Sequence, residues 1–300
     1  MRPAWFNGET ILRENSLPQT GTSVNEEPQP AVVIEPLKGW FSFDFRELWE
    51  YRELLYFFIW RDIKVRYKQT ILGGVWVILQ PVVPMVIFSI FFGMLAGIPS
   101  EDIPYPIFTY TALLPWHLFA SAFFASSRSL VMNQSLITRV YFPRLFVPLS
   151  VILGGLIDFA IAFSVLLGMM YYYRIQLTWA ALTLPLYLLL TLLTALALGL
   201  WTSALNVLYR DVHHVITFLT QFLMFATPIF YPASLVPERW RVLYGLNPMV
   251  GVVEGFRWAL LGKAQTVELS AILSAPVVVL LFAGGLLFFN RTEKTFADVI

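Results

Sequence analysis

Long apolar runs separated by short polar turns fill the chain from residue 72 to residue 290. The apolar runs cover residues 72–98, 106–130, 145–170, 177–205, 215–231 and 269–289. A helix needs about 20 predominantly apolar residues to cross the hydrocarbon core of a bilayer. The pattern therefore predicts an all-α integral membrane protein with a domain of six transmembrane helices over residues 72–290.

A different pattern precedes the first apolar run, in residues 46–68. At about 100° per residue, one side of a helix there is apolar and the other charged. The apolar side holds Tyr51, Leu55, Phe58 and Ile59. The charged side holds Glu50, Glu53, Arg61, Lys64 and Lys68. Asp62 and Arg66 interrupt the apolar side, and their i,i+4 spacing allows them to form an ion pair.

Residues 46–68 are too charged to span a bilayer. A helix of this kind, basic at one end and rich in aromatic residues, is expected to lie in the plane of the membrane interface. Two interpretations stay open. The helix is either a general membrane-surface anchor, or a gate that moves against the first span and opens a pore.

A short basic loop, residues 131–145, separates the second and third spans. The nearby charges are Arg128, Arg139 and Arg144. Charged turns do not sit in hydrocarbon, and their positive sign favours the cytoplasmic side. The loop also has apolar residues that we expect to be exposed and suited to docking on another protein: Leu136, Ile137, Val140, Tyr141 and Phe142. An ordinary turn between two spans is the alternative.

Before the last span, residues 232–268 form broken apolar segments of about ten residues, which are too short to span. They are interrupted by Pro237, Gly245, Pro248 and Gly262. Paired re-entrant helices would fit, because such backbone is tolerated at membrane depth only when it is buried in protein or lines water. Glu254 and Arg257 are spaced to form a local pair there.

The polar ends, residues 1–45 and 291–300, are interpreted as tails on one side of the membrane. With six spans, fifteen of the Lys and Arg residues fall on the side of the termini and five on the other. Cytoplasmic loops carry an excess of Lys and Arg. Both termini are therefore expected in the cytoplasm.

Two polar residues within the predicted spans are candidates for a special role. Asp158 is a carboxylate deep in the third span, so a partner is expected, either as a structural hydrogen bond or as part of a functional site. His117 is placed near the end of the second span, as a satisfied interfacial residue. Four aromatic residues either belong to the interfacial belts or provide a sliding surface for a glycan at a pore mouth. These four are Trp60, Tyr67, Trp76 and Trp116.

Composition excludes several functions. The chain is 58% hydrophobic and 13% charged, with a mean hydropathy of +0.69, so it is not a soluble domain. Its net charge of +1 gives no reason to expect nucleic acid as a partner. Cysteine is absent, three His residues form no convincing metal site, and no phosphate-binding G-x-x-x-x-G-K-[ST] motif occurs. We therefore expect no cofactor or metal in this chain, and no catalytic constellation is evident.

Several motifs in order resemble the permease subunits of type 2 ABC transporters that export polysaccharides such as O-antigen, capsule and teichoic acid. The resemblance covers about residues 40–300. It rests on ELWEYRELLYFFIWRDIKVRYKQTILGGVWVILQP (47–81), SLITRVYFPRLFVPLS (135–150), NVLYRDVHH (206–214) and TPIFYPASLVPERWRVLYGLNPM (227–249). The combination is specific, whereas each motif alone is not.

The resemblance implies a homodimer in the bacterial inner membrane, working with two separate ATPase subunits that bind ATP and Mg. It implies that residues 46–68 form a gate helix, that 134–144 form the coupling helix on the ATPase, and that 232–262 cap the exit. The implied coupling residues are Gln134, Leu136, Ile137, Arg139, Tyr141, Phe142 and Arg144. The implied substrate is a lipid-linked polysaccharide that moves outwards, most often on undecaprenyl diphosphate, with membrane lipids as surroundings.

A hypothesis for the gate helix follows. The basic residues of its C-terminal half, beside Trp60, would attract the lipid diphosphate at the inner surface. These residues are Arg61, Lys64, Arg66 and Lys68. Anchoring to anionic lipid is the alternative. Two other functions stay open: a type 2 permease for drugs or lipids, and a membrane enzyme acting on lipid-linked sugars. O-antigen, capsule and teichoic acid are not separated by this sequence.

Overall fold

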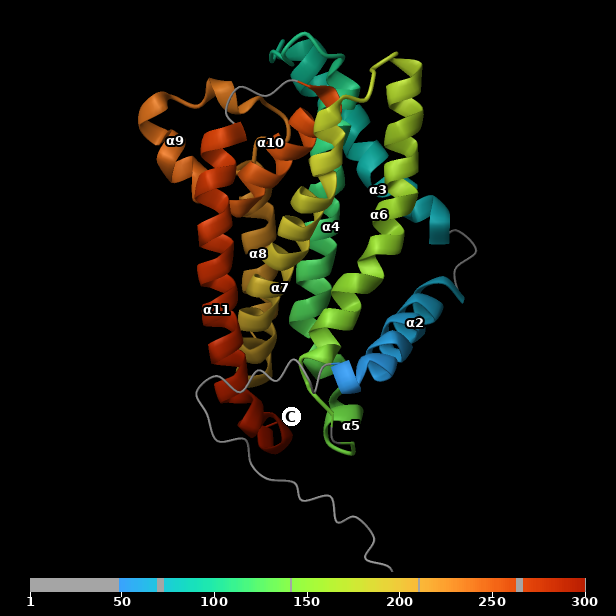
Figure 1. The fold of residues 1–300 in the computed structure, drawn as a ribbon, viewed down its shortest axis with the longest axis vertical. Helices are drawn as coiled ribbons and strands as arrows, with labels where there is room; N and C mark the ends of the chain where they lie inside the picture. The colour runs from blue at the N-terminus through green and yellow to red at the C-terminus, as the bar shows by residue number, and fades with distance from the viewer. Residues whose placement is uncertain (1–48, 69–72, 141, 210, 263–266, 300) are drawn as a thin grey trace, which may run out of the picture. The chain divides into compact units, whose positions relative to one another are not determined.

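The computed structural model describes residues 49–68, 73–140, 142–209, 211–262 and 267–299. These residues are arranged almost entirely in helices, and no strand occurs among them (Figure 1). The predicted N-terminal tail, residues 1–45, lies outside the described residues, as does Tyr141. The all-α class predicted from the sequence is confirmed.

Five helices among the described residues are long and apolar enough to cross a membrane. They are α3 (Gly73–Phe88) with the π-helix that continues it (Ser89–Leu95), α4 (Tyr105–Met132), α6 (Phe146–Tyr172), the 3-10 turn Trp179–Thr183 with α7 (Leu184–Leu208), and α11 (Val267–Val299). They correspond to the first four predicted spans and the last one. The bounds of α4 and α6 agree with the predictions to within about two residues. An uninterrupted apolar run in a bilayer leaves the backbone no polar partner other than the helix itself.

The predicted fifth span is shorter than expected. It corresponds to α8 (Val212–Phe225), whose 14 residues extend about 21 Å at about 1.5 Å per residue. The hydrocarbon core is about 30 Å thick. The segment after Phe225 leaves the helical path and reaches only a short 3-10 turn, Ala233–Leu235. Six crossings therefore remain a prediction, in which α8 would add one crossing to the five that the long helices can make.

Helix α4 is the centre of the bundle. In its most apolar stretch 78% of the residues are buried, against 6% for α3, which lies at the periphery. Close approach of α4 and α7 depends on small residues, since a Cβ at Gly199 would lie 2.3 Å from Oγ of Ser126. His117 is the thirteenth residue of α4 and half-buried, so its predicted position near a span end was wrong.

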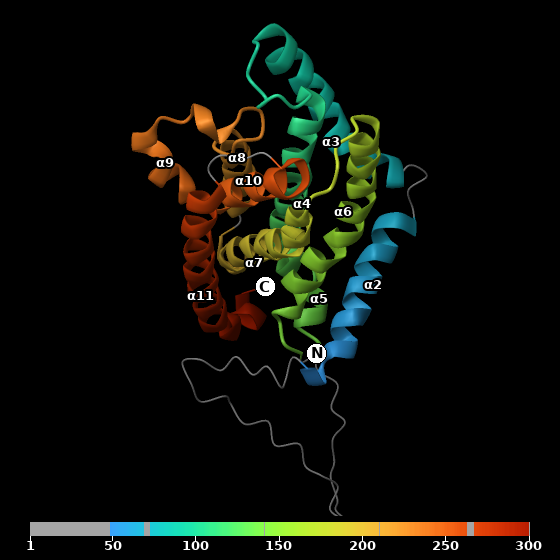
Figure 2. The ribbon, with the colours of Figure 1, turned by 45° about the horizontal axis from the view of Figure 1, so that its top comes forward.

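Helix α2 (Arg52–Lys68) lies along one half of α6, as both views show (Figures 1 and 2). Its Phe58 contacts Phe142, just before α6 begins, and its Arg66 contacts Asp158, twelve residues further along α6. Twelve helical residues correspond to about 18 Å. Helix α2 therefore runs beside the first half of the third predicted span, and its position in the plane of the membrane interface stays a prediction.

Two short helices occupy the segment before the last span, as its broken pattern predicted: α9 (Glu238–Gly245) and α10 (Pro248–Leu261). Asn247 caps α10 by accepting a hydrogen bond from the Met249 amide, and Gly262 ends it with a φ of 69°. Most of α10 is buried. Burial meets the condition for short helices at membrane depth, and their re-entry stays a prediction. Helix α11 continues to Val299, so residues 291–299 extend the helix.

Candidate functional site

An ion pair joins α2 to the middle of α6. Arg66 Nη1 donates to Oδ2 of Asp158, and the hydroxyl of Tyr67 donates to Oδ1 of the same carboxylate. Asp158 is the thirteenth residue of α6, halfway along it. The partner expected for this carboxylate is therefore present, and it comes from α2. The arrangement neutralises an ionised group at a depth where an unpaired charge is costly.

Tyr67 acts as a donor in this arrangement. Burial and the hydrogen bond to Asp158, together with the negative charge of that carboxylate, raise the pKa of Tyr67 to about 12. The phenol therefore stays protonated at neutral pH and keeps donating its hydrogen bond. The contribution to folding is complete below pH 10 and is lost only as the pH rises through about 12.

A second polar contact lies near the middle of α2. Arg61 Nη2 donates to Oδ1 of Asp62 at 2.8 Å and to Oδ1 of Asn133 at 2.9 Å. Oδ2 of Asp62 accepts from the hydroxyl of Ser150 at 3.2 Å. The sequence spacing suggested that Asp62 pairs with Arg66. That prediction was wrong, because each residue finds a partner on another helix within reach.

Aromatic packing accompanies this second contact. Phe58 is 3% exposed, and its ring meets the ring of Phe142 edge-on, with centroids 5.4 Å apart. The guanidinium of Arg61 lies 5.0 Å from the centroid of Phe58. Arg144 also leaves the loop for the bundle, since its Nη1 donates to the carbonyl of Glu293 in α11. The loop is therefore attached to α2 and to α11.

The loop between α4 and α6 contains one short helix, α5 (Gln134–Ile137). Ile137 and Phe142 are buried, so the expectation that they are exposed for docking was wrong. Leu136 and Arg144 are half-buried, and the exposed residues of the loop are Gln134, Ser135, Thr138, Arg139 and Val140. Among the described residues of the loop, a docking partner would meet a mainly polar surface with one basic residue, Arg139, and one apolar residue, Val140. The coupling role of this loop stays a prediction.

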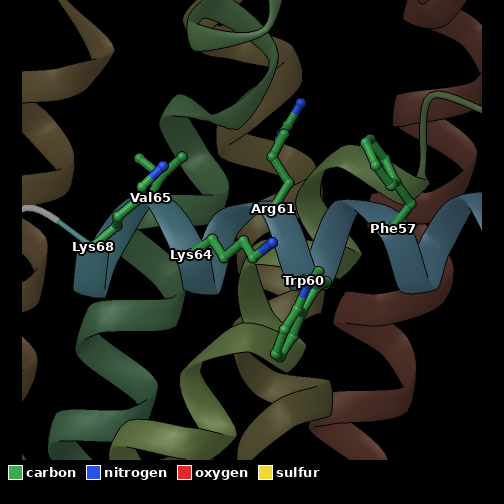
Figure 3. A pocket seen from close by; sticks show the side chains of 6 residues that line it. All are labelled: Phe57, Trp60, Arg61, Lys64, Val65 and Lys68. Carbon is green, nitrogen blue, oxygen red and sulfur yellow. The ribbon is translucent and has the colours of Figure 1, made fainter.

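The outer face of α2 is hollowed and basic. A hollow of about 410 Å³ is lined by Phe57, Trp60, Arg61, Lys64, Val65 and Lys68 (Figure 3). Nζ of Lys64 lies 5.6 Å from the centroid of Trp60, and the figure shows these two side chains together. Lys64 and Lys68 are exposed, and among the described residues no carboxylate forms an ion pair with either. Of the predicted diphosphate-approach residues, Arg66 lies outside the hollow and pairs with Asp158, and Arg61 lines the hollow while it also donates to Asn133.

The remaining aromatic candidates do not share one surface. Trp76 is exposed on α3, where it fits either lipid or a glycan path. Trp116 is 3% exposed inside α4, with its ring 5.4 Å from that of Phe119. The suggestion that Trp116 faces a glycan channel is therefore not supported by its position. Tyr67 is engaged with Asp158, as described above.

At the opposite end of the bundle from α5, a buried cation organises the segment between α8 and α9. Arg257 Nη2 donates to the carbonyl of Ile229 at 2.9 Å, and Nη1 lies 3.2 Å from Oε1 of Glu254. Its guanidinium stacks on Phe108 at 3.6 Å from the ring centroid. The predicted pairing of Glu254 and Arg257 is confirmed. The pair fixes the non-helical backbone of 226–232 against α4 and α10.

Sequence reasoning missed two residues of the α2 attachment, Asn133 and Ser150. Both are small polar residues beside the basic loop, and neither has a distinctive motif. Asn133 is the residue between α4 and α5, where a polar residue that ends one helix and begins another is common. That position was the available signal. Among the described residues, no group of three or more His, Cys, Asp and Glu is placed to bind a metal ion.

Long apolar helices around a buried α4, with a basic helix fastened along one of them, define a multi-pass membrane protein. Residues 53–261 match the family model described as ABC-2 type transporter. The chain is 31% identical over 259 residues to the O-antigen export system permease protein RfbA of Myxococcus xanthus, covering 85% of this chain and 98% of that protein. RfbA of Klebsiella pneumoniae is 26% identical over 242 residues, covering 80% and 92%.

A third relative is the polysialic acid transport protein KpsM of Escherichia coli, which is 27% identical over 240 residues, covering 78% of this chain and 91% of that protein. The family match spans more than half of the chain, and the Myxococcus relative is aligned over nearly its whole length. The chain therefore belongs to the ABC-2 type transporter family and is a membrane transport permease.

Proposed function

We propose that this chain is the permease subunit of an ATP-driven exporter that moves a lipid-linked polysaccharide, of O-antigen type, out of the cytoplasm across the inner membrane. In this proposal it acts as a homodimer with two ATPase subunits, which bind ATP and Mg. The resemblance found in the sequence and the printed functions of the three relatives support the substrate class.

One structural observation supports a direct route from the loop to α2. The loop that would dock on the ATPase is in contact with α2, through Arg61 and Asn133 and through Phe58 and Phe142. Movement of the loop would therefore be transmitted directly to the helix that we interpret as the gate. This route is shorter than one that passes through the second and third spans.

The hollow on α2 fits the head group of the proposed substrate. Two exposed ammonium groups, Lys64 and Lys68, lie beside Trp60 on a helix that rises along the third span. Charged groups at such depth face water or a partner rather than lipid chains. A diphosphate carries the charge that these groups attract, and the indole offers a flat apolar face. We assign the end of the bundle that carries the α4–α6 loop to the cytoplasmic side because the excess of Lys and Arg lies on that side.

A permease for drugs or other lipids is the second candidate within the family. The hollow distinguishes the two, because an apolar drug needs no pair of exposed lysines. The third candidate, a membrane enzyme, is distinguished by the chemical structure of the glycan after the reaction. An enzyme would alter the glycan, whereas a permease transports it without chemical change.

The test is reconstitution of the full chain with its ATPase in proteoliposomes containing a fluorescent undecaprenyl diphosphate-linked glycan. We expect ATP-dependent transfer of unmodified glycan to the opposite face, which is read by accessibility to a glycan-specific lectin. Transfer of a drug with no glycan movement would support the second candidate. Glycan that is chemically altered without ATP would support the enzyme.

A further inference from the structure

The two ends of α2 are held in different ways. In the N-terminal half, Phe58 is buried and packed on Phe142, and Tyr51, Leu54 and Leu55 pack against the core. In the C-terminal half, Lys64, Val65 and Lys68 are exposed, and the contacts with α6 are made by Ile63, by the hydrogen bond between Asp62 and Ser150, and by the Arg66–Asp158–Tyr67 cluster. The first half is fixed by apolar burial, and the second half is fixed largely by polar groups.

The Arg66–Asp158 pair differs from the ion pair at the other end of the bundle. The side chains of Arg66 and Asp158 are 37% and 23% exposed, whereas those of Arg257 and Glu254 are 2% and 4% exposed. The first pair is therefore less enclosed by protein than the second, so its separation leaves less buried charge uncompensated. Breaking the second pair leaves two charges in the protein interior.

The surface under α2 is smooth where separation would occur. Gly154 of α6 is buried beneath α2, and a Cβ placed there would lie 4.0 Å from Cγ1 of Ile63. No side chain at this position interlocks with Ile63. The C-terminal half of α2 can therefore leave α6 without withdrawing a large side chain from a socket, unlike the N-terminal half, where Phe58 is enclosed.

We propose that the Arg66–Asp158–Tyr67 cluster is a releasable latch that holds the C-terminal half of α2 against α6. Release turns α2 about its N-terminal half, which stays attached to the loop through Phe58, Phe142, Arg61 and Asn133. While the cluster is intact, the basic hollow of α2 stays beside the third span. When the cluster separates, the hollow moves away from that span. This inference rests on the proposed function, because it assigns the opening step to a nucleotide-driven movement of the loop.

The absence of cysteine from the chain makes the latch directly testable. In the reconstituted complex with its ATPase, Ile63→Cys is labelled with a maleimide in the nucleotide-free and ATP-bound states. The latch predicts that labelling rises in the ATP-bound state. Asp158→Asn, which removes the ion pair, is expected to raise nucleotide-free labelling by about threefold, the effect of one partly exposed pair. The exchange Arg66→Asp with Asp158→Arg is expected to restore low labelling.

The second measurement uses a disulfide to hold α2 against α6. An Ile63→Cys, Gly154→Cys pair is oxidised to join α2 to α6, and export is compared before and after reduction. A matched pair, Leu118→Cys with Gly155→Cys, joins α4 to α6 instead, because a Cβ at Gly155 would lie 3.4 Å from Cδ1 of Leu118. The latch predicts loss of export in the first oxidised pair, recovery on reduction, and continued export in the second.

The outcomes separate the latch from the proposed function. Export by the oxidised α2–α6 pair, or labelling of Ile63→Cys that is equal in both nucleotide states while the complex exports glycan, overturns the latch and leaves the function standing. If the double variant fails to assemble, the single-cysteine labelling decides alone. A chain that binds no ATPase and moves no glycan overturns the proposed function instead.

Discussion

Arg61 and Asn133, 72 positions apart in the sequence, are joined by a hydrogen bond of 2.9 Å between Nη2 of the arginine and Oδ1 of the asparagine. Arg61 belongs to the helix interpreted as the gate, and Asn133 stands between the second span and the loop interpreted as the ATPase-docking element. The two elements that the mechanism must connect are therefore in direct contact, without a span between them.

The first prediction concerns this hydrogen bond. Asn133→Ala removes the acceptor, so the loop should pull less firmly on α2. A hydrogen bond of this kind contributes about 1 kcal/mol, and we expect about a fivefold fall in glycan exported per ATP hydrolysed. Asn133→Asp keeps an acceptor and should retain export, and Ser135→Ala is a matched change at an exposed site in the same loop. Equal export per ATP in Asn133→Ala and Ser135→Ala would contradict the connection.

The second prediction concerns the basic hollow on α2. The double change Lys64→Gln, Lys68→Gln removes two exposed charges that we propose attract the head group of the substrate lipid. Each such charge contributes about 1 kcal/mol near an anionic surface, so affinity for a diphosphate-linked lipid should fall by about thirtyfold. Binding is measured with vesicles that contain the lipid at fixed ionic strength. Arg52→Gln, on the same helix but outside the hollow, is the control, and an equal loss there would reduce the effect to general surface attraction.

The third prediction concerns the buried pair Arg257 and Glu254. Arg257→Met leaves a carboxylate without its cation in the protein interior and removes the donors to the carbonyls of Ile229 and Tyr231. We expect a loss of stability of about 3–5 kcal/mol, measured by thermal unfolding in detergent. Arg257→Met with Glu254→Leu should recover part of the loss. An unchanged unfolding temperature in the single variant would show that the pair is not a structural fixture.

The fourth prediction concerns packing of α10 against α7. A Cβ at Gly255 would lie 2.1 Å from Cε1 of Tyr187, so Gly255→Ala must displace that ring. Overpacking of this kind costs about 1–3 kcal/mol. Gly168→Ala is the matched control, because nothing lies within 4 Å of a Cβ there. The unfolding temperature should fall for Gly255→Ala and stay level or rise for Gly168→Ala. A similar fall in both would indicate a general intolerance of helix substitution.

The sequence predicted most helices because long apolar runs have few alternatives in a bilayer, and the bounds of α4 and α6 fall within about two residues of the expected ones. It could not predict which polar groups meet. Asp62 and Arg66 satisfy the i,i+4 rule, but that rule describes an isolated helix. Asp158 and Ser150, brought close by the packing of α6, offered partners that no local pattern contains.

Burial was the other property that sequence reasoning misjudged. Ile137 and Phe142 were expected on a docking surface because they stand in a polar loop, yet Phe142 packs on Phe58 and both are buried. Trp116 was expected near a pore mouth because aromatic residues gather at interfaces, yet α4 is the central helix and buries it. In each case the packing neighbour lies far away in the sequence, so the pattern around the residue could not reveal it.

The most direct test of the account is the ATP dependence of glycan movement in proteoliposomes that contain the full chain, its ATPase, or both. The account predicts that neither component alone moves the undecaprenyl diphosphate-linked glycan, and that the two together move it only when ATP is hydrolysed. Movement by the chain alone without ATP, or failure of the ATPase to bind the chain, would contradict it.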